Sequence, residues 1–239
     1  MNHTGHIVLV TGGATGIGFA LAQKFHAAGN RVIVVGRSTR ALDSAAAALP
    51  GILTRVADIS VAAHRDMLVT EFPEVSVLVN NAGIQNNIPL SESSPADIEH
   101  ELTINFLGPV LLSRAFLPHL VQREVAAIIN VSSVLALVPK QSASIYCASK
   151  AALHSFSRTL RWQLEHTRVR VFEVLPPLVD TAMTRGRGKG KMSSAQLADA
   201  FWEGFQRDIF EMPIGKTKVV AFINRLLPSV AETIMRRGL

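Results

Sequence analysis

The chain has 239 residues, of which 48% are hydrophobic and 18% are charged, a composition that excludes a disordered chain and predicts one folded domain, residues 1–239. Its single cysteine, Cys147, excludes an intramolecular disulfide and a multi-cysteine zinc site, so we expect no metal site and a reducing, cytoplasmic location. A formal charge of +6 favours anionic partners without choosing among nucleic acid, acidic lipid and a phosphate-bearing small molecule.

The N-terminal sequence MNHTGHIVLV leads directly into a short apolar strand, without the basic segment and long apolar run of a secretory signal. No apolar run reaches the roughly 18 residues that a transmembrane helix needs. We therefore expect a soluble protein with no transmembrane segment.

Short runs rich in valine and isoleucine alternate with longer stretches whose apolar residues recur at helical spacing. The predicted strands are His6–Thr11, Arg31–Gly36, Ile52–Ala57, Val75–Asn80, Ala127–Ser132 and Val169–Val174. The predicted helices are Gly16–Ala28, Thr39–Leu49, Ala62–Glu71, Pro95–Arg123 and Ala143–Glu165. This succession is typical of right-handed crossovers between parallel strands, so we predict an α/β fold with a doubly wound parallel sheet flanked by helices.

Beyond Val174 the alternation stops. Two prolines and the glycines at 186, 188 and 190 predict a mobile loop followed by an amphipathic helix, and we expect residues 183–215 to act as a lid. Residues 216–239 are expected to form two short helices interrupted at Pro228. This helical C-terminal extension would cover core or form a subunit contact, and a helix on a membrane surface is the alternative.

The first predicted strand runs into the sequence TGGATGIG, which places glycines at Gly12, Gly16 and Gly18. A Cβ at these positions would block a tight turn or the approach of a pyrophosphate, whose charge is held by backbone N–H groups at a helix N-terminus. Between a buried strand and a helix, this spacing indicates a dinucleotide site, and a plain glycine-rich turn is the alternative.

The end of the second strand indicates which dinucleotide binds. Sites for NAD commonly carry an acidic residue there, whereas this chain has Arg37 after Gly36 and no carboxylate beside it in the sequence. The arginine fork matches a 2′-phosphate, so we predict NADP(H), with a solvated arginine as the alternative. Asp58, after the third strand, would accept from the adenine amino group or cap a helix.

Tyr146 and Lys150 stand four residues apart in a helical stretch, so their side chains share one face. The ammonium group is expected to lower the pKa of the phenol, which makes the pair a candidate acid and base. Ser133 follows the strand AIINVS, at the edge of the sheet where ligands bind, and its hydroxyl would hold a carbonyl group. Ser132 is the neighbouring alternative, and either serine would also suit a turn.

With TGGATGIG, NNAG, the serine and YCASK in this order, the chain resembles the compact subtype of the short-chain dehydrogenase/reductase family from Ile7 to Thr181, and its tail more loosely resembles a bacterial DltE-like subgroup. The resemblance implies a Rossmann-type fold, Tyr146 as general acid/base and Lys150 bridging the ribose hydroxyls. It also implies that Ser133 orients the carbonyl and that Asn105 holds a water for proton relay. A buried polar group in a helix is the alternative for Asn105.

The resemblance places Asn80 and Ala82 on the adenosine side, Gly83 beside the ribose, and Val179 and Thr181 at the nicotinamide amide. The expected cofactor-binding residues are Gly12, Thr15, Gly16, Ile17, Gly18, Arg37, Asp58, Asn80, Ala82, Gly83, Tyr146, Lys150, Val179 and Thr181. The chain departs from the family in two places. Pro177 stands where glycine is usual, and the final strand with a terminal Asp-Gly-Gly is missing.

These features predict an NADP(H)-dependent oxidoreductase that interconverts a carbonyl and a secondary alcohol of a small-molecule substrate. A catalytically silent dinucleotide-binding sensor or scaffold is the alternative. We expect a homodimer or homotetramer in which the helices within 95–123 and 143–165 pair.

The basic run RGRGKGK, Arg185–Lys191, allows three interpretations. It would form a solvated lid tip, close over the cofactor and an anionic substrate, or tether nucleic acid. The last is disfavoured because no aromatic residues for base stacking are interleaved.

Overall fold

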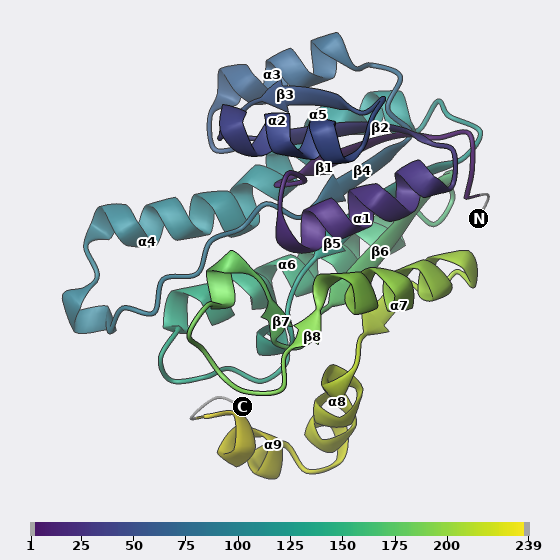
Figure 1. Ribbon diagram of the computed structural model, residues 1–239. Coiled ribbons are helices and arrows are strands. Elements are labelled where there is room, and N and C mark those ends of the chain that lie inside the picture. The colour runs from purple at the N-terminus through teal and green to yellow at the C-terminus, as the bar shows by residue number, and fades with distance from the viewer. Residues whose placement is uncertain (1–2, 237–239) are drawn as a thin grey trace.

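The computed structural model describes residues 3–236, and its centre is a seven-stranded parallel sheet in the order β3-β2-β1-β4-β5-β6-β9 (Figure 1). The strands are β1 (Ile7–Thr11), β2 (Arg31–Gly36), β3 (Leu53–Val56), β4 (Val77–Asn80), β5 (Ala126–Val131), β6 (Val169–Leu175) and β9 (Glu211–Pro213). The strand order reverses between β1 and β4, so a doubly wound sheet has its ligand-binding crevice at the carboxyl ends of these strands.

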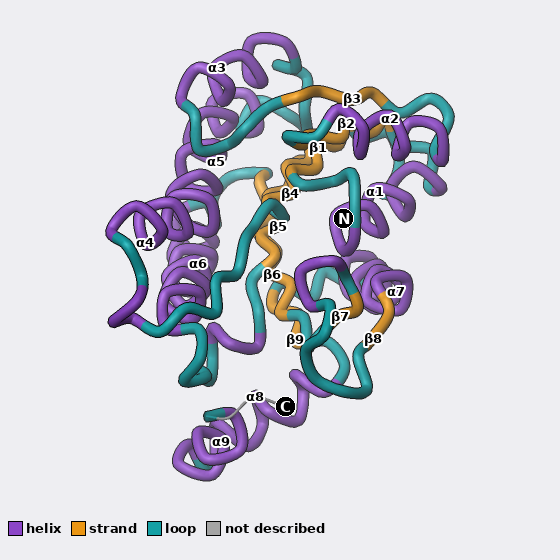
Figure 2. Tube along the Cα trace, turned by 60° about the vertical axis from the view of Figure 1, so that its left-hand side comes forward, coloured by secondary structure: helices purple, strands orange, loops and turns teal. Residues whose placement is uncertain are grey.

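Helices cover both faces of the sheet. Figure 2 views the sheet nearly edge-on, with helices on either side of it. One face packs against α1 (Gly16–Ala27), α2 (Thr39–Ala48) and α7 (Ser194–Gln206). The other packs against α3 (Ala62–Glu71), α5 (Gly108–Leu120) and α6 (Ser144–Gln163). The predicted α/β fold with a doubly wound, Rossmann-type sheet is confirmed.

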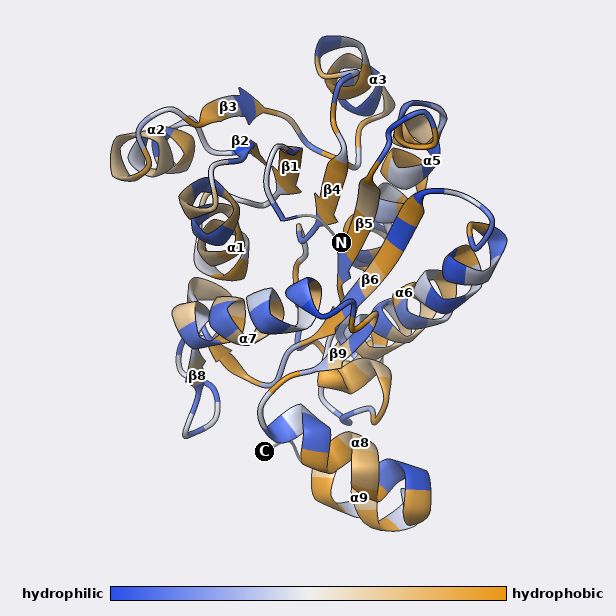
Figure 3. Cartoon of the chain, turned by 90° about the vertical axis from the view of Figure 1, so that its right-hand side faces the viewer, coloured by the Kyte–Doolittle hydropathy of each residue, from blue (hydrophilic) through white to orange (hydrophobic). Residues whose placement is uncertain are grey.

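Strand β1 shows why the strands read as continuous apolar runs. Val8 and Val10 face the core beneath α1, while Leu9 between them faces the core beneath α5, and all three are completely buried. The same apolar character continues through the central strands in Figure 3. A strand that is covered on both sides has no polar face, which is why its sequence does not alternate.

The helix predicted over 95–123 is interrupted by one wider turn. It consists of α4 (Pro95–Leu102), a π-helical turn at Thr103–Leu107 and α5. Ser94 caps the start by accepting from the Asp97 backbone N–H. The π turn carries Asn105 and places its side chain in the protein interior, and such turns often occur at functional sites.

The sheet has one strand more than the sequence predicted, because β9 pairs in parallel with β6. The expectation that a final strand is missing was therefore wrong for the sheet itself.

The segment 183–215, predicted to be a lid, divides into two parts. Its first part is a loop between the short paired strands β7 (Val179–Asp180) and β8 (Met192–Ser193), and its second part is α7.

Helix α7 belongs to the hydrophobic core rather than to a lid. Leu197, Phe201 and Phe205 are completely buried, and the ring of Phe25 in α1 lies 5.5 Å from that of Phe205. The apolar stripe of α7 therefore packs into the core on this face of the sheet.

The C-terminal extension consists of α8 (Lys216–Leu226) and α9 (Pro228–Met235), which lie side by side beyond the sheet (Figures 1 and 3). Pro228 is the first residue of α9, as predicted; residues 237–239 lie outside the described part of the chain. Met235 and Val220 pack with Val134 and Val138, so the extension covers the turn that follows β5. Across residues 3–236, no helix has the length and apolar character to cross a bilayer.

Candidate active site

A cavity of about 530 Å³ lies at the carboxyl ends of the central strands. Its walls come from the glycine turn after β1, the segments after β4 and β5, the first turns of α6 and the loop after β6. Of the predicted site residues it gathers Gly12, Thr15, Gly16, Ile17, Ala82, Gly83, Ser133, Tyr146, Lys150, Val179 and Thr181. The two halves of the site predicted from distant sequence segments therefore share one cavity.

The glycine turn has the form of a cradle for a pyrophosphate. Gly12 and Gly16 adopt φ values of +61° and +56°, a conformation that side chains rarely tolerate. A Cβ on Gly18 would collide with the Gly12 carbonyl and the Asn81 amide, and one on Gly16 would lie 3.1 Å from Thr181 Cγ2. The N-terminus of α1 faces this space, so the residues present fit a dinucleotide.

Asn81 holds the glycine turn in place. Its amide Nδ2 donates to the carbonyl oxygens of Thr11 and Gly12 at 2.9 and 3.1 Å, and its backbone N–H donates to Thr11 Oγ1 at 3.0 Å. The sequence prediction was Asn80 instead, but Asn80 is buried outside the cavity. Its amide donates to Ser113 Oγ and to Asn130 Oδ1. Because strand residues alternate between faces, only one residue of the pair can reach the turn, and NNAG does not show which.

Arg37 stands at the end of β2, as predicted, but it does have a carboxylate beside it. Asp58 Oδ2 lies 3.7 Å from Arg37 Nη1, because β2 and β3 end side by side. Burial raises the pKa of Asp58, but hydrogen bonds from Ser60 and the charge of Arg37 outweigh burial and hold that pKa below its ordinary value. Neither residue lines the cavity itself, and the Arg37 side chain is 57% exposed.

Ser133, Tyr146 and Lys150 meet at the other end of the cavity. Lys150 Nζ donates to the Val131 carbonyl at 2.9 Å and lies 5.8 Å from the centre of the Tyr146 ring. Ser133 Oγ accepts from the Leu135 N–H at 3.1 Å, which fixes the hydroxyl at the end of β5. All three side chains are buried, so water reaches them only through the cavity.

The pKa values of this pair differ from the sequence prediction. Burial raises the pKa of Tyr146 to about 12, and a hydrogen bond with Ser133 opposes the rise. Burial also lowers the pKa of Lys150 to about 8, although the nearby Glu173 carboxylate opposes this change. The expected lowering of the phenol pKa by Lys150 is therefore not found, because desolvation of the phenolate raises that pKa instead.

Asn105 is completely buried and does not line the cavity. Its Oδ1 accepts from the Ile84 N–H at 2.9 Å, and its Nδ2 donates to the Ile84 carbonyl at 2.9 Å and to Ser149 Oγ at 3.1 Å. Asn105 thus joins the segment after β4 to helix α6. Its amide group is engaged with protein partners.

The segment after β6 forms the remaining wall, with Pro176, Pro177, Val179 and Thr181 at the cavity. The Pro176 carbonyl accepts from the Val134 N–H at 3.0 Å, which ties this segment to the turn after β5. Pro177 therefore occupies the lining while contributing no N–H donor.

Several polar and apolar lining residues were not predicted from the sequence. They are Asn81, Gln85, Asn87, Lys140, Ser142 and Met235. Asn81 lies within NNAG, which did not distinguish it from Asn80, and the other five belong to no motif, since tertiary packing brings them to the cavity. Arg187 also lines the cavity, which the basic run had suggested without distinguishing it from its neighbours.

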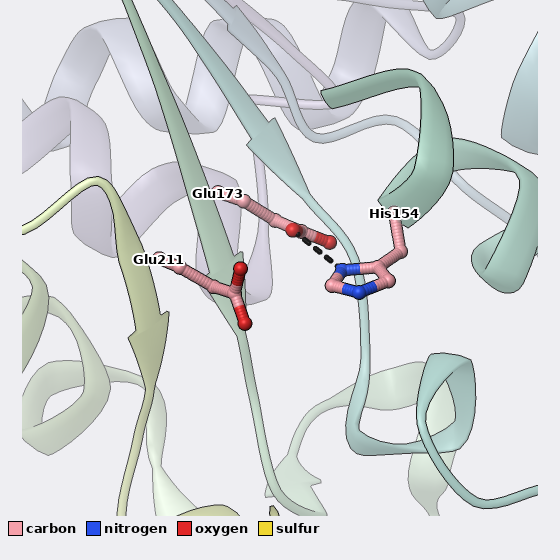
Figure 4. Close-up of side chains that lie close together, drawn as sticks. All are labelled: His154, Glu173 and Glu211. Carbon is pink, nitrogen blue, oxygen red and sulfur yellow. Dashed lines mark hydrogen bonds and ion pairs between the residues drawn. The ribbon is translucent and has the colours of Figure 1, made fainter. Parts of the chain in front are cut away.

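A second group of titratable side chains, one each from α6, β6 and β9, lies at the neighbouring edge of the sheet (Figure 4). His154 Nδ1 donates to Glu173 Oε2 at 2.8 Å, and this bond raises the pKa of His154. Ligand atoms of His154, Glu173 and Glu211 lie within 4.8 Å of one another, a spacing that could also hold a metal ion. We assign an ion pair, because the short hydrogen bond engages two of the atoms that a metal would need.

The family model for short chain dehydrogenases matches residues 6–191. The uncharacterized oxidoreductase DltE of Bacillus subtilis (strain 168) is 44% identical over 191 residues, which cover 77% of this chain and 76% of the relative. A short chain dehydrogenase from Burkholderia cenocepacia J2315, solved with NADP, is 28% identical and superposes with a TM-score of 0.90 over 98% of each chain.

A second solved structure, a short chain dehydrogenase/reductase from Burkholderia phymatum in complex with NAD, is 24% identical. It superposes with a TM-score of 0.86 over 100% of this chain and 98% of its own. The fold, the glycine cradle and these similarities agree, and the chain belongs to the short-chain dehydrogenase/reductase family of oxidoreductases.

Proposed function

We propose that this protein is an NADP(H)-dependent oxidoreductase that interconverts a carbonyl and a secondary alcohol on a small-molecule substrate. The observation that carries the proposal is the meeting of Ser133, Tyr146 and Lys150 at one end of a cavity whose other end is the glycine cradle. A dinucleotide held at that cradle by Gly12, Gly16 and Asn81, with Val179 and Thr181 beyond them, would supply or accept the hydride.

In the direction of reduction, the Tyr146 hydroxyl donates its proton to the substrate oxygen as the carbonyl carbon gains the hydride. The high pKa of Tyr146 keeps this proton in place until charge develops on the substrate oxygen. Ser133 donates a second hydrogen bond to the same oxygen and stabilises the developing alkoxide. Lys150 then stabilises the phenolate that remains, and Asn105 positions the helix turn that carries both residues.

The preference for NADP(H) rests on Arg37. Its guanidinium is exposed at the end of β2, where it would pair with a 2′-phosphate. Asp58 Oδ2 lies 3.7 Å from Arg37 Nη1 and leaves the guanidinium exposed to solvent. The same carboxylate would also accept from a ribose hydroxyl or an adenine amino group. We therefore expect a preference of about tenfold for NADPH rather than an exclusion of NADH, which corresponds to about 1.4 kcal/mol.

The test is a fluorescence titration with NADPH and with NADH, followed by a screen of NADPH oxidation with ketones and aldehydes. Arg37→Ala should remove the preference for NADPH, while Arg31→Ala, at the opposite end of the same strand, should keep it. Oxidation of NADPH by at least one carbonyl compound is required. Tight NADPH binding without turnover of any carbonyl would instead favour a dinucleotide-binding sensor, and binding of neither dinucleotide would end the proposal.

We also propose that two or four copies assemble through α5 and α6. Leu107 at the end of the π turn, Leu111 in α5 and Trp162 near the end of α6 are exposed to solvent, Trp162 by 60%. Large apolar side chains on such helices are typical of subunit contacts. Light scattering on the purified protein measures the number of copies directly.

A further inference from the structure

Two cationic side chains stand at the tyrosine end of the cavity without a carboxylate partner. Lys140 precedes α6, and Arg187 belongs to the loop between β7 and β8. Both are half-buried cavity residues. Within residues 3–236, neither forms an ion pair with Asp or Glu. A partly desolvated cation with no countercharge is a site prepared for an anion.

Neutral groups fix the position of Arg187. Its Nη2 donates to the Gln85 carbonyl at 3.5 Å. The donors and acceptors around Asn87 orient its amide oxygen toward the guanidinium, 2.8 Å from Nη1 and 3.2 Å from Nε. These bonds draw the loop across the cavity to the segment after β4, and they leave the positive charge uncompensated. Folding therefore already orders the guanidinium, so binding of an anion would not have to order this side chain.

The other cations of the basic run have different surroundings. Lys191 Nζ donates to the Thr184 carbonyl at 2.7 Å and pairs with Asp180 at 3.3 Å, so it fastens the base of the loop. Arg185 and Lys189 are exposed and do not line the cavity. The charge that faces the site is therefore a property of Arg187 rather than of the run as a whole.

The surroundings of the two cations support this assignment. Burial lowers the pKa of Lys140, and the charge of Arg187 lowers it further, so an anion between them would relieve both effects. Glu101, in α4, does not line the cavity. Its Oε1 accepts from the Asn86 N–H at 3.0 Å, so this carboxylate is engaged away from the two cations, and burial raises its pKa. Met183 and Met235 supply apolar wall beside the cations.

We propose that the substrate is a carbonyl compound that carries a carboxylate, which Arg187 and Lys140 bind while the carbonyl faces Tyr146 and Ser133. This inference rests on the proposed carbonyl reduction and assigns its substrate class. Arg187 is here a specificity-determining residue, since its fork matches a carboxylate with two parallel hydrogen bonds.

The test compares keto acids with their neutral methyl esters. Acetoacetate, 4-oxopentanoate and 5-oxohexanoate vary the spacing between carbonyl and carboxylate, and each is assayed against its methyl ester by NADPH oxidation. We expect the wild-type protein to prefer the acid by at least about tenfold in kcat/KM for one or more pairs. Arg187→Gln should lower kcat/KM for that acid about a hundredfold and leave the ester within about twofold, because only the acid loses a charged partner.

Arg185→Gln is the matched control, since it removes the same charge from the exposed side of the same loop and should change neither substrate. NADPH affinity should be the same in all three proteins. Equal loss of acid and ester in Arg187→Gln, or no preference for any acid, would overturn the inference. Weaker NADPH binding with an unchanged ratio of acid to ester would assign Arg187 to the cofactor phosphates and overturn it as well.

If no carbonyl compound is reduced, calorimetric titration of the NADPH-loaded protein with hexanoate and with hexanamide separates the two proposals. Binding of hexanoate but not hexanamide, lost in Arg187→Gln, would keep the carboxylate site while the proposed reaction falls. Absence of hexanoate binding would overturn the carboxylate site together with the proposed reaction.

Discussion

The two ends of the cavity are built on opposite principles. At the glycine end the site consists of missing side chains, since Gly12, Gly16 and Gly18 leave space that a Cβ would fill. At the tyrosine end it consists of buried titratable groups whose pKa values burial displaces, upward for Tyr146 and downward for Lys150. The first end depends on local backbone geometry, and the second depends on what folding places around each charge.

The two ends also differ in their effect on the stability of the folded protein. The glycine turn satisfies its backbone through the Asn81 amide, so the protein stabilises this end before any ligand binds. Lys150 is buried with a backbone carbonyl as its direct partner, and its lowered pKa means that folding works against its charge. Destabilisation of this kind is common where a charged group serves function rather than packing.

The strongest test of the glycine end is Gly18→Ala. The added Cβ would meet the Gly12 carbonyl and the Asn81 amide, so the turn must open. We expect NADPH affinity to fall about a hundredfold or more, as overpacking by about 3 kcal/mol implies. A fluorescence titration with NADPH measures this loss.

Gly29→Ala, at the other end of α1, is the control for this variant. Gly29 also has a positive φ of +79°, but no atom lies within 4 Å of the position that a Cβ would take, so the added methyl meets open space. We expect a stability loss of about 1 kcal/mol and unchanged NADPH affinity. Equal NADPH affinity in Gly18→Ala and the wild type would show that the close approach at the cradle is unimportant.

At the tyrosine end, Lys150→Met should lower the activity and raise the free energy of unfolding at pH 7. The pKa of Lys150 falls from an ordinary 10.5 to about 8 in the folded protein, so the unfolded chain binds the proton more tightly between these values. Stability should therefore rise as the pH increases through this window, by up to about 3 kcal/mol. Below the window the buried lysine opposes folding, and methionine should stabilise the protein at pH 7 by about 2 kcal/mol after loss of one hydrogen bond.

Denaturant unfolding at several pH values checks this difference, with the exposed Lys218→Met as control. The advantage of Lys150→Met over wild type should fall as the pH rises from 8 to 10.5 and reverse to a deficit of about 1 kcal/mol, whereas Lys218→Met should show no such trend. A constant difference across this range would mean that Lys150 keeps its ordinary pKa in the folded protein.

The contrast between the two ends also explains what the sequence could predict. Strand β2 and helix α3 begin and end at the predicted residues, and β2 does so because it is an uninterrupted apolar run. Strand β9 was missed, since Glu-Met-Pro is three residues long and has no apolar run; pairing with β6 is what makes it a strand. The π turn at Asn105 follows from tertiary contacts with Ile84 and leaves no mark in the apolar pattern.

Among the site residues, the glycines and the Tyr146–Lys150 pair could be predicted because their geometry is fixed by spacing along the chain. The residues that lie beside each charged side chain could not be predicted in this way. Asp58 reaches Arg37 from a different strand, and Lys140 and Arg187 stand 47 residues apart in sequence (187 − 140) at one cavity. Such contacts depend on the packed fold, which is why the pKa of Tyr146 also differed from expectation.

The central claim is that Tyr146 transfers the proton while the glycine end holds the dinucleotide independently. Tyr146→Phe removes the hydroxyl and keeps the ring, so turnover of the best carbonyl substrate and NADPH affinity should be measured on the same preparation. We predict that kcat falls at least about a hundredfold, as loss of general acid catalysis implies, while the Kd for NADPH stays within about twofold. A phenylalanine variant as active as the wild type would contradict the account.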